Sequence, residues 1–292
     1  MSLQSSTQKE KNAVLGGVLY LVATPIGNLS DISERALKVL SEVDFVAAED
    51  TRNTGLMLSR FGISKPMVSY FEHNKRERGG QIAARLENGE SCALVTDAGT
   101  PAISDPGEDI VRLCAERGIT VTSIPGCCAA ITALTLSGID TRRFCFEGFL
   151  SANKGERRDR LSELEGEKRT MIFYEAPHKL KTTLSDLMKH FGEDRQIALC
   201  RELTKLNEEV SRTTIGSAVK FYEEKDPRGE YVLIVAGASI AAKADYPEDP
   251  VLHVEMLVGS GMSKKDAIKA AAKARGVAKN DIYSLVMKKD EE

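Results

Sequence analysis

The sequence predicts a two-domain α/β protein followed by a small helical module at its C-terminal end. Three observations lead to this prediction. The 292 residues are too many for one small core and suit about two domains. As far as residue 138, apolar strand patterns alternate with helical patterns, which is typical of a parallel sheet covered by helices. A second set of strands and helices follows, and after residue 250 only helical patterns remain.

In the first domain, residues 17–138, a β-rich apolar run at 17–23 predicts a buried strand that ends before Pro25. The other predicted strands share this apolar character and span residues 43–48, 67–71, 92–96 and 119–124. The predicted helices carry apolar residues at helical spacing and span residues 33–40, 52–61, 76–87, 108–117 and 128–137.

The second domain is predicted to cover residues 139–240, with its boundary near 137–143. Its predicted strands span residues 144–150, 170–174, 196–201, 210–214 and 231–236, and its helices 157–164, 179–190 and 217–224. Two prolines and three acidic residues make 241–250 a predicted linker. The module 251–292 is predicted to hold helices at 251–258, 263–274 and 279–287, and the polar residues 1–16 to form a disordered tail.

Composition restricts the class of protein. The net charge is −3, so a polyanionic partner has to be met by a local basic patch. The longest apolar stretch, 231–242, is too short to span a bilayer, and the N-terminus lacks the apolar core of a signal peptide. None of the six cysteines forms a CxxC pair, which predicts reduced thiols and no metal site. We therefore expect a cytoplasmic protein with no membrane or metal partner.

Polar and glycine-rich segments follow the predicted strands of the first domain. In open parallel sheets, ligands bind beyond the carboxyl ends of the strands. The segment DAGTPAISDPG, residues 97–107, has two glycines and two prolines that constrain an irregular backbone. Such a loop either holds a nucleoside and an amino-acid group by its main chain or only turns the chain. No GxGxxG follows the first strand and no GxxxxGK[ST] occurs, so a Rossmann dinucleotide site and a P-loop are disfavoured.

Three more segments carry small or polar residues at strand ends. PGCCAA, residues 125–130, permits close approach of a ligand at a helix N-terminus, although tight helix–sheet packing favours the same residues. FYEAPH, residues 173–178, runs from a strand into a helix. RELTKLNEE, residues 201–209, follows a buried strand with two cations and three carboxylates, a pattern that a solvated loop also explains.

Taken together, the motifs resemble the tetrapyrrole methylase superfamily, and within it the ribosomal RNA small subunit methyltransferase I branch. The resemblance covers about residues 17–237 and rests on eight motifs in order: TPIGNLSD, AEDTR, YFEHN, DAGTPAISDPG, PGCCAA, FYEAPH, RELTKLNEE and GEYVLIVAG. It implies two α/β domains with the cofactor in the cleft between them, and a homodimer. It also implies methyl transfer from S-adenosylmethionine to the 2′-hydroxyl of a cytidine ribose in the decoding region of 16S rRNA.

By similarity, the cofactor contacts are expected on residues of several loops: Pro25, Asp97, Gly99, Thr100, Pro101, Ala102, Ile103, Ser104, Cys128, Ala129, Tyr174, Glu175, Glu230 and Tyr231. A ribose hydroxyl is a poor nucleophile, so a base or a cation near its oxygen is expected to help. The candidates are Arg201, Lys205, Glu202, Asp50 and Arg52. Burial would let a lysine act as a base, and a charged lysine would instead orient a phosphate.

Two other functions are compatible with these motifs. One keeps the fold and methylates a corrinoid or porphyrin ring, although those branches begin with a Gly-rich loop where this chain has TPIGNL. The other is a non-catalytic RNA-binding assembly protein, which would not bind the cofactor.

The C-terminal module carries a local excess of positive charge. Residues 262–289 contain eight Lys or Arg and two Asp, a local charge of +6 in a chain whose total is −3. Ser263 is a predicted helix N-cap, and Ala267, Ile268, Ala271 and Ala272 form a predicted apolar stripe. We expect RNA phosphates to bind the basic residues Lys264, Lys265, Lys269, Lys273 and Arg275. A solubilising helical cap is the alternative.

Overall fold

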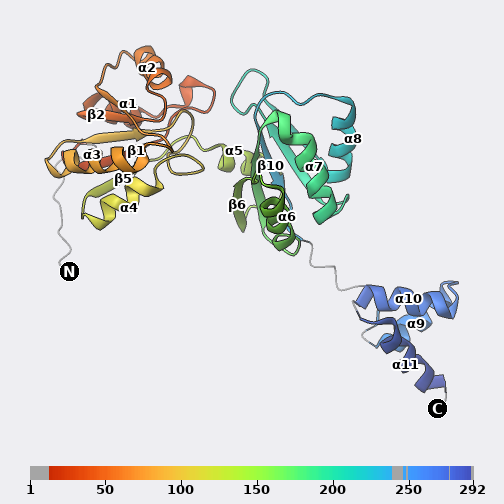
Figure 1. Ribbon diagram of the computed structural model, residues 1–292. Coiled ribbons are helices and arrows are strands. Elements are labelled where there is room, and N and C mark those ends of the chain that lie inside the picture. Colours follow the sequence, from red (N-terminus) through yellow and green to blue (C-terminus); the bar gives the residue numbers. More distant parts are fainter. Residues whose placement is uncertain (1–12, 239–245, 248, 276, 291–292) are drawn as a thin grey trace. The chain divides into compact units, whose positions relative to one another are not determined.

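The structure is a computed structural model that describes residues 13–238, 246–247, 249–275 and 277–290 (Figure 1). The chain forms two compact units that divide between residues 238 and 239, and each is described by itself. The predicted tail, residues 1–16, lies outside the described residues as far as residue 12. The predicted linker, 241–250, does so at 241–245 and 248.

The first sheet of unit 1 is entirely parallel, as predicted. Its strands lie in the order β3-β2-β4-β1-β5. The strand bounds are β1 (Val18–Val22), β2 (Phe45–Ala48), β3 (Met67–Ser69), β4 (Cys92–Val95) and β5 (Thr120–Ile124). Parallel strands need a crossover between them, and helical patterns between the strand patterns of the sequence supply it.

Helices cover both faces of this sheet because its buried strands are apolar at every position. On β1, Val18, Tyr20 and Val22 face one core, and Leu19 between them faces the other. The first core packs against α1 (Glu34–Glu42) and α2 (Thr51–Arg60), and the second against α3 (Lys75–Glu87) and α4 (Glu108–Glu116). A 3₁₀ turn, η1 (Leu29–Asp31), precedes α1, whose predicted N-terminus is confirmed by the Ser33 side chain accepting from Ala36 N.

The second sheet of unit 1 is mixed, in the order β6-β7-β10-β8-β9. Only β6 and β7 pair in parallel, and the other neighbours are antiparallel. The strands are β6 (Phe144–Phe149), β7 (Thr170–Glu175), β8 (Gln196–Arg201), β9 (Glu209–Thr214) and β10 (Tyr231–Val235). The large core on one face includes residues of α6 (Lys154–Glu163), α7 (Pro177–Phe191) and α8 (Ile215–Glu224).

The other face of the second sheet is covered by α5 (Ala129–Leu136). Ala130, Ala133 and Leu134 of this helix are buried against Ile172 and Val232 of the sheet. The helix precedes the predicted boundary at 138/139, yet its core partners come from the second sheet. Its N-terminus, which follows β5, therefore lies where the loops of the two sheets meet.

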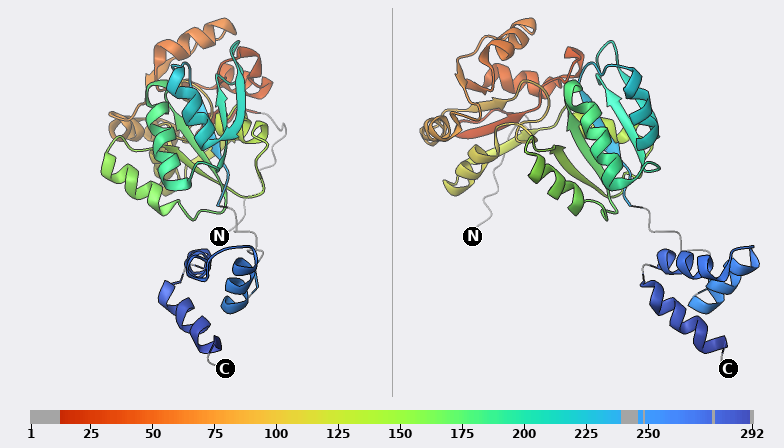
Figure 2. Two further views of the ribbon diagram at one scale, coloured as in Figure 1. Left: turned by 90° about the vertical axis from the view of Figure 1, so that its right-hand side faces the viewer. Right: turned by 45° about the vertical axis from the view of Figure 1, so that its right-hand side comes forward.

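Unit 2 is a bundle of three short helices, α9 (Pro250–Gly259), α10 (Lys264–Arg275) and α11 (Lys279–Asp290) (Figure 2). The predicted apolar stripe is confirmed, because Ala267, Ile268, Ala271 and Ala272 are all buried in the core of this unit. Ser263 is the predicted N-cap, and its hydroxyl accepts from Asp266 N at 3.2 Å. Within the described part of the chain, no helix is both long and apolar enough to cross a membrane.

Candidate functional site

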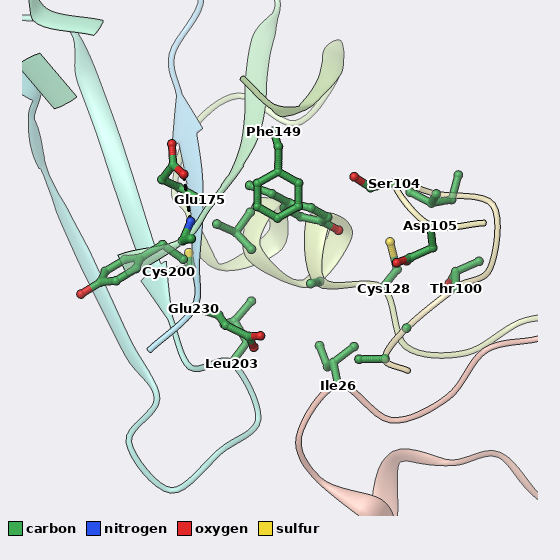
Figure 3. Close-up of a pocket in the computed structure, with 18 of the residues that line it drawn as sticks. Ile26, Thr100, Ser104, Asp105, Cys128, Phe149, Glu175, Cys200, Leu203 and Glu230 are labelled. Carbon is green, nitrogen blue, oxygen red and sulfur yellow. Dashed lines mark hydrogen bonds between the residues drawn. The ribbon is translucent and has the colours of Figure 1, made fainter. Parts of the chain in front are cut away.

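A cavity of about 390 Å³ lies where loops of the first sheet meet α5 and the second sheet (Figure 3). This volume is typical of small-molecule sites. The predicted cofactor or catalytic residues that line it are Gly99, Thr100, Ile103, Ser104, Cys128, Ala129, Tyr174, Glu175, Lys205, Glu230 and Tyr231. The structure therefore gathers residues from five separate sequence motifs around one cavity.

The 97–107 loop forms one wall, and its backbone is strained. Ala102 and Ser104 have φ values of 66° and 65°, which residues with a side chain rarely adopt. Gly107 has φ 151°, and a Cβ there would lie 3.0 Å from both Cβ and N of Ala102. Strain of this kind persists only where surrounding structure enforces it, and it clusters at functional sites.

Gly99 holds this loop in place through its main chain. Its N–H donates to Thr24 O at 3.0 Å, and its carbonyl accepts from Thr24 N at 2.9 Å. Thr100 Oγ1 donates to Cys127 O at 2.9 Å, which joins the loop to the segment before α5. The amide and carbonyl of Gly99 are thus used within the protein, and its contribution to the cavity wall is its lack of a side chain.

The N-terminus of α5 forms the floor between the two sheets. Cys128 is its N-cap residue and makes no side-chain capping bond, and Ala129 follows it. Ala130 N donates to Tyr174 Oη at 3.2 Å, which ties the helix to β7. Gly126 lies so close to β1 that a Cβ would stand 2.8 Å from Ala23 Cβ. Gly126 therefore serves packing, while Cys128 and Ala129 line the cavity, where the expected approach of a ligand stays a prediction.

The second sheet supplies an aromatic wall. The Tyr174 ring meets Phe146 and Phe149 edge to face, with centroids 5.1 and 5.6 Å apart. Burial raises the pKa of Tyr174 to about 12, so its hydroxyl stays protonated at neutral pH. Glu175 is satisfied inside the protein, because one carboxylate oxygen accepts from Ala176 N at 2.9 Å and the other from Thr183 Oγ1.

The 201–209 loop closes the opposite side of the cavity with ion pairs. Lys205 Nζ lies 2.9 Å from Glu202 Oε1 and 2.8 Å from Glu230 Oε2. Burial lowers the pKa of Lys205, but hydrogen bonds to Glu230 and Glu202 outweigh burial, so the net direction is upward. The loop also packs against Gly27, which lies after β1 of the first sheet, because a Cβ on Gly27 would lie 2.5 Å from Lys205 Cγ. The ammonium therefore stays charged, and the interpretation of Lys205 as a neutral base is disfavoured.

The remaining catalytic candidates make contacts outside the cavity lining. Asp50 is the N-cap of α2, and Arg52 pairs with it at 2.6 Å, which lowers the pKa of Asp50 to about 2. Arg201 pairs with Glu209 at 2.9 Å and lines a separate hollow. Glu202 Oε1 accepts a hydrogen bond from Lys205 Nζ at 2.9 Å.

Three expected cofactor residues, Pro25, Pro101 and Ala102, belong to the wall-forming loops but do not line the cavity. The fourth, Asp97, is an exposed residue whose Oδ2 accepts from Asn53 Nδ2 at 3.0 Å.

Nine residues of the cavity lining were missing from the sequence-based set: Asp105, Phe149, Ile26, Ala98, Ala176, Pro177, Cys200, Leu203 and Val232. Asp105 belongs to the same DAGTPAISDPG segment, and burial, the Glu49 carboxylate and the Asp97 carboxylate raise its pKa to about 6. Phe149 ends β6, and its side chain is 56% exposed on the cavity wall. Phe149 lies at the end of a strand, so the rule that ligands bind beyond strand ends could have identified it. No pattern in the sequence indicated that Asp105 would be buried. Among the residues that the structure describes, no three His, Cys, Asp or Glu side chains gather as a metal site would require.

In unit 2 the predicted RNA-binding residues separate into two groups. Lys264, Lys265, Lys269 and Lys273 are exposed, away from the buried stripe of α10. Arg275 instead makes contacts within the unit: its guanidinium lies over the Tyr246 ring at 4.7 Å and donates to Pro247 O and Asp249 O. The structure therefore favours a bracing role for Arg275.

Relatives resemble this chain over nearly its whole length. It is 46% identical to "Ribosomal RNA small subunit methyltransferase I" of Halalkalibacterium halodurans, over 98% of this chain and 99% of that protein. The protein of the same name from Escherichia coli O157:H7 is 46% identical over 93% of this chain and 95% of its own length. That from Synechocystis is 43% identical over 92% and 97%.

Solved structures and a family model agree on the fold. A cobalt precorrin-4 methyltransferase superposes with a TM-score of 0.56 at 17% identity, over 75% of this chain and 95% of that one. The uroporphyrin-III-C-methyltransferase of Thermus thermophilus gives a TM-score of 0.55 at 18% identity, over 75% and 94%. The family model "Tetrapyrrole (Corrin/Porphyrin) Methylases" matches residues 18–219. The chain belongs to the tetrapyrrole methylase family, and within it to the family of ribosomal RNA small subunit methyltransferase I.

Proposed function

We propose that this protein transfers a methyl group from S-adenosylmethionine to the 2′-hydroxyl of a cytidine ribose in the decoding region of 16S rRNA. The observation that carries the proposal is the 43–46% identity to rRNA small subunit methyltransferases over nearly the full length of both chains. The likeness to methylases of tetrapyrrole rings, at 17–18% identity, is one of fold alone.

The cavity suits S-adenosylmethionine by size and by chemistry. Its wall is largely apolar with few polar groups, as is typical of sites for small organic ligands. The residues proposed to hold it are Thr100, Ile103 and Ser104 on one wall, Cys128 and Ala129 on the floor, and Tyr174, Glu230 and Tyr231 on the other wall. When bound, the cofactor supplies an electrophilic methyl group on a sulfonium.

We propose that Lys205, Glu202 and Arg201 act on the site as positioning residues. The ion pairs of Lys205 hold the 201–209 loop against the strand end at Glu230, and the same side chain packs on Gly27. Methyl transfer is an in-line displacement whose rate depends on the alignment of the reacting atoms. A loop held in this way keeps one cavity wall in place during alignment.

The exposed lysines of α10 are proposed to bind RNA phosphates. Lys265, Lys269 and Lys273 recur every four residues and so lie along one side of the helix, opposite its buried stripe. Replacing all three by Gln is expected to lower the slope of log affinity against log salt by about 2, since each phosphate contact on single-stranded RNA contributes about 0.7. The matched control replaces Lys38, Lys168 and Lys220 in unit 1 by Gln. Equal slopes in both variants would leave α10 a structural role only.

The proposal is tested in two steps. Calorimetric titration with S-adenosylmethionine tests for the cofactor site, which a non-catalytic assembly protein would lack. Small ribosomal subunits are then incubated with enzyme and labelled cofactor, and the rRNA is digested to nucleosides for mass spectrometry. We expect labelled 2′-O-methylcytidine from one site; label on a base, or none at all, would refute the proposal. Light scattering tests the proposed homodimer, and cell fractionation the proposed cytoplasmic location.

A further inference from the structure

The proposed reaction needs an acceptor for the hydroxyl proton, because a neutral ribose hydroxyl is a weak nucleophile. The titratable side chains of the cavity wall are three carboxylates, a lysine, two tyrosines and two thiols: Asp105, Glu175, Glu230, Lys205, Tyr174, Tyr231, Cys128 and Cys200. Their contacts within the protein distinguish one from the rest.

Two of the carboxylates are already engaged. Both oxygens of Glu175 accept hydrogen bonds from Ala176 N and Thr183 Oγ1, so the group is fixed in place as a structural acceptor. Glu230 pairs with Lys205 at 2.8 Å, so its carboxylate already has a cationic partner. Lys205 itself is held as an ammonium by that pair and by Glu202.

The tyrosines and the thiols are unsuitable for chemical reasons. Tyr231 is buried, and its oxygen accepts from Tyr222 Oη at 3.3 Å. Cys200 is buried and donates to Ala133 O, and burial raises the pKa of its thiol to about 11. Tyr174 is protonated, with its pKa raised to about 12 by burial, and its oxygen accepts from Ala130 N. Cys128 could accept a proton only after becoming a thiolate. A thiolate is a far better nucleophile toward a sulfonium methyl group than a ribose oxygen, so it would itself be methylated.

Asp105 is in a different situation. It follows Ser104, whose φ is 65°, and precedes Pro106, so its backbone is held rigidly on the cavity wall. Both Asp105 and Cys128 line the cavity, and Figure 3 labels them among its side chains. Among the described residues no cation pairs with it, and Thr96 is the side chain whose polar contact favours its ionised form. Its neighbouring charges are carboxylates, namely Glu49 and Asp97.

We propose that Asp105 is the catalytic residue that accepts the proton of the target hydroxyl; this inference rests on the proposed function. The ribose oxygen forms a bond to the methyl carbon as the carbon–sulfur bond breaks, and that electron pair remains on the sulfur. The hydroxyl proton passes to the Asp105 carboxylate and then to water. Charge and atoms balance, because a sulfonium cation and a carboxylate become a neutral thioether and a carboxylic acid.

The surroundings of Asp105 tune it for this role. Burial, Glu49 and Asp97 raise its pKa to about 6, and the Thr96 hydrogen bond opposes them. From the second sheet it faces Tyr174, a neutral group at working pH. A general base is most effective when its pKa lies near the operating pH. Asp105 is ionised above about pH 6, so turnover is expected to fall as pH drops through that value.

The test measures single-turnover methyl transfer to small ribosomal subunits from pH 5 to 9, with saturating cofactor. We expect the wild-type rate to rise with unit slope and level off above about pH 6. Asp105→Asn is expected to lower the plateau rate by about 10²–10⁴-fold and to abolish the rise of the rate with pH. Asp105→Glu is expected to restore part of the rate. Asp109→Asn, on α4 and paired with Lys75 outside the cavity, is the matched control and should keep the wild-type profile.

A second measurement separates proton transfer from ligand binding. S-adenosylhomocysteine, the demethylated product, is titrated by calorimetry into both Asp105 variants. Affinity within about threefold of wild type is expected, because the proposed partner of Asp105 is the RNA hydroxyl. Loss of affinity in Asp105→Asn that matches its loss of rate would make it a cofactor ligand and overturn the inference. The inference is also overturned if the rate of Asp105→Asn rises with pH below about pH 6 in the same way as the wild-type rate.

Failure of the inference can be told from failure of the proposed function. If wild-type protein methylates the ribose and Asp105→Asn does so at an equal rate, the inference alone fails. If wild-type protein binds S-adenosylhomocysteine but does not methylate small subunits at any pH, the proposed function fails and the inference with it. If the wild-type rate does not fall as pH drops below about pH 6, the inference is overturned whether or not the variants fold.

Discussion

The two loops that face each other across the cavity are both strained but are held by different forces. Ala102 and Ser104 in the 97–107 loop and Glu202 and Thr204 in the 201–209 loop are the four non-glycine residues with positive φ in the described chain. The first loop is held by its backbone, through prolines, Gly107 and the bridge between Thr24 and Gly99. The second is held by side-chain ion pairs that centre on Lys205.

This difference determines which loop has reactive side chains that are free to act on a ligand. A loop held by ion pairs neutralises its own charges, so few of them remain to act on a ligand. A loop held by its backbone leaves its side chains uncommitted, and here it presents Asp105 to the cavity without a cation. The proposed proton acceptor therefore lies on the loop that has two charged residues, and not on the RELTKLNEE segment, which has five.

The largest expected effect on ligand binding concerns the helix between the loops. Ala129→Leu adds bulk to a cavity-lining position at the N-terminus of α5 and should weaken binding of S-adenosylhomocysteine by about 1–3 kcal/mol, or about 5- to 150-fold. Calorimetry on the folded variant measures this. Ala115→Leu, at an exposed position of α4, is the control. Unchanged affinity in Ala129→Leu would remove α5 from the site.

Backbone control of the first loop predicts a sensitive glycine. Gly107→Ala places a Cβ 3.0 Å from Ala102 at a φ of 151°, and should lower the free energy of unfolding by about 1–3 kcal/mol. Gly118→Ala, which has positive φ but open space around it, isolates the cost of conformation alone. Chemical denaturation of both variants measures the difference. A smaller loss for Gly107→Ala than for Gly118→Ala would contradict the backbone account.

The unpaired state of Asp105 predicts a pH-dependent gain in stability on its removal. Its pKa is about 6 in the folded protein and 3.8 as an ordinary carboxyl, so between these values the folded state binds more protons than the unfolded state. Wild-type stability therefore falls as pH rises through this window. Asp105→Asn should melt roughly 1–3 °C above wild type at pH 7.5, and this advantage should vanish toward pH 4.

Asp109→Asn is the control with the opposite sign. Hydrogen bonding to Lys75 lowers the pKa of Asp109, so its ionised form stabilises the fold above its ordinary pKa. Its replacement should lower the melting temperature at pH 7.5 and have less effect toward pH 4. Scanning calorimetry across pH checks both signs. A lower melting temperature for Asp105→Asn at pH 7.5 would mean that the carboxylate is stabilised by a partner.

The smallest effect is expected from the ion-paired loop. Lys205→Met keeps the packing against Gly27 but removes two partly exposed ion pairs, each worth about 0–1 kcal/mol. Turnover should fall less than about 10-fold, and affinity for S-adenosylhomocysteine should barely change. A loss of turnover as large as that of Asp105→Asn would reverse the comparison and assign the proton-transfer role to the lysine loop.

Much of the architecture was predictable because it depends on local patterns. The alternation of apolar runs with helical spacing predicted the parallel first sheet, and an apolar stripe with Ser263 as cap predicted α10. Six of the eight motif segments contribute residues to the cavity lining, whereas AEDTR and YFEHN do not. The partners of each side chain were not predictable: Arg275 was grouped with the exposed lysines, although its guanidinium binds Pro247 and Asp249.

By itself, the sequence determined the order of strands and helices, the family and the loops that form the site, since these follow from residue type and spacing along the chain. Only the tertiary structure decided that α5 packs on the second sheet, that Lys205 is paired twice and that Asp105 is not paired with a cation. The reason is physical. A side chain's charge state depends on burial and on neighbours brought close by folding, and residues distant in sequence, such as Glu49 and Asp105, set each other's pKa only once they meet.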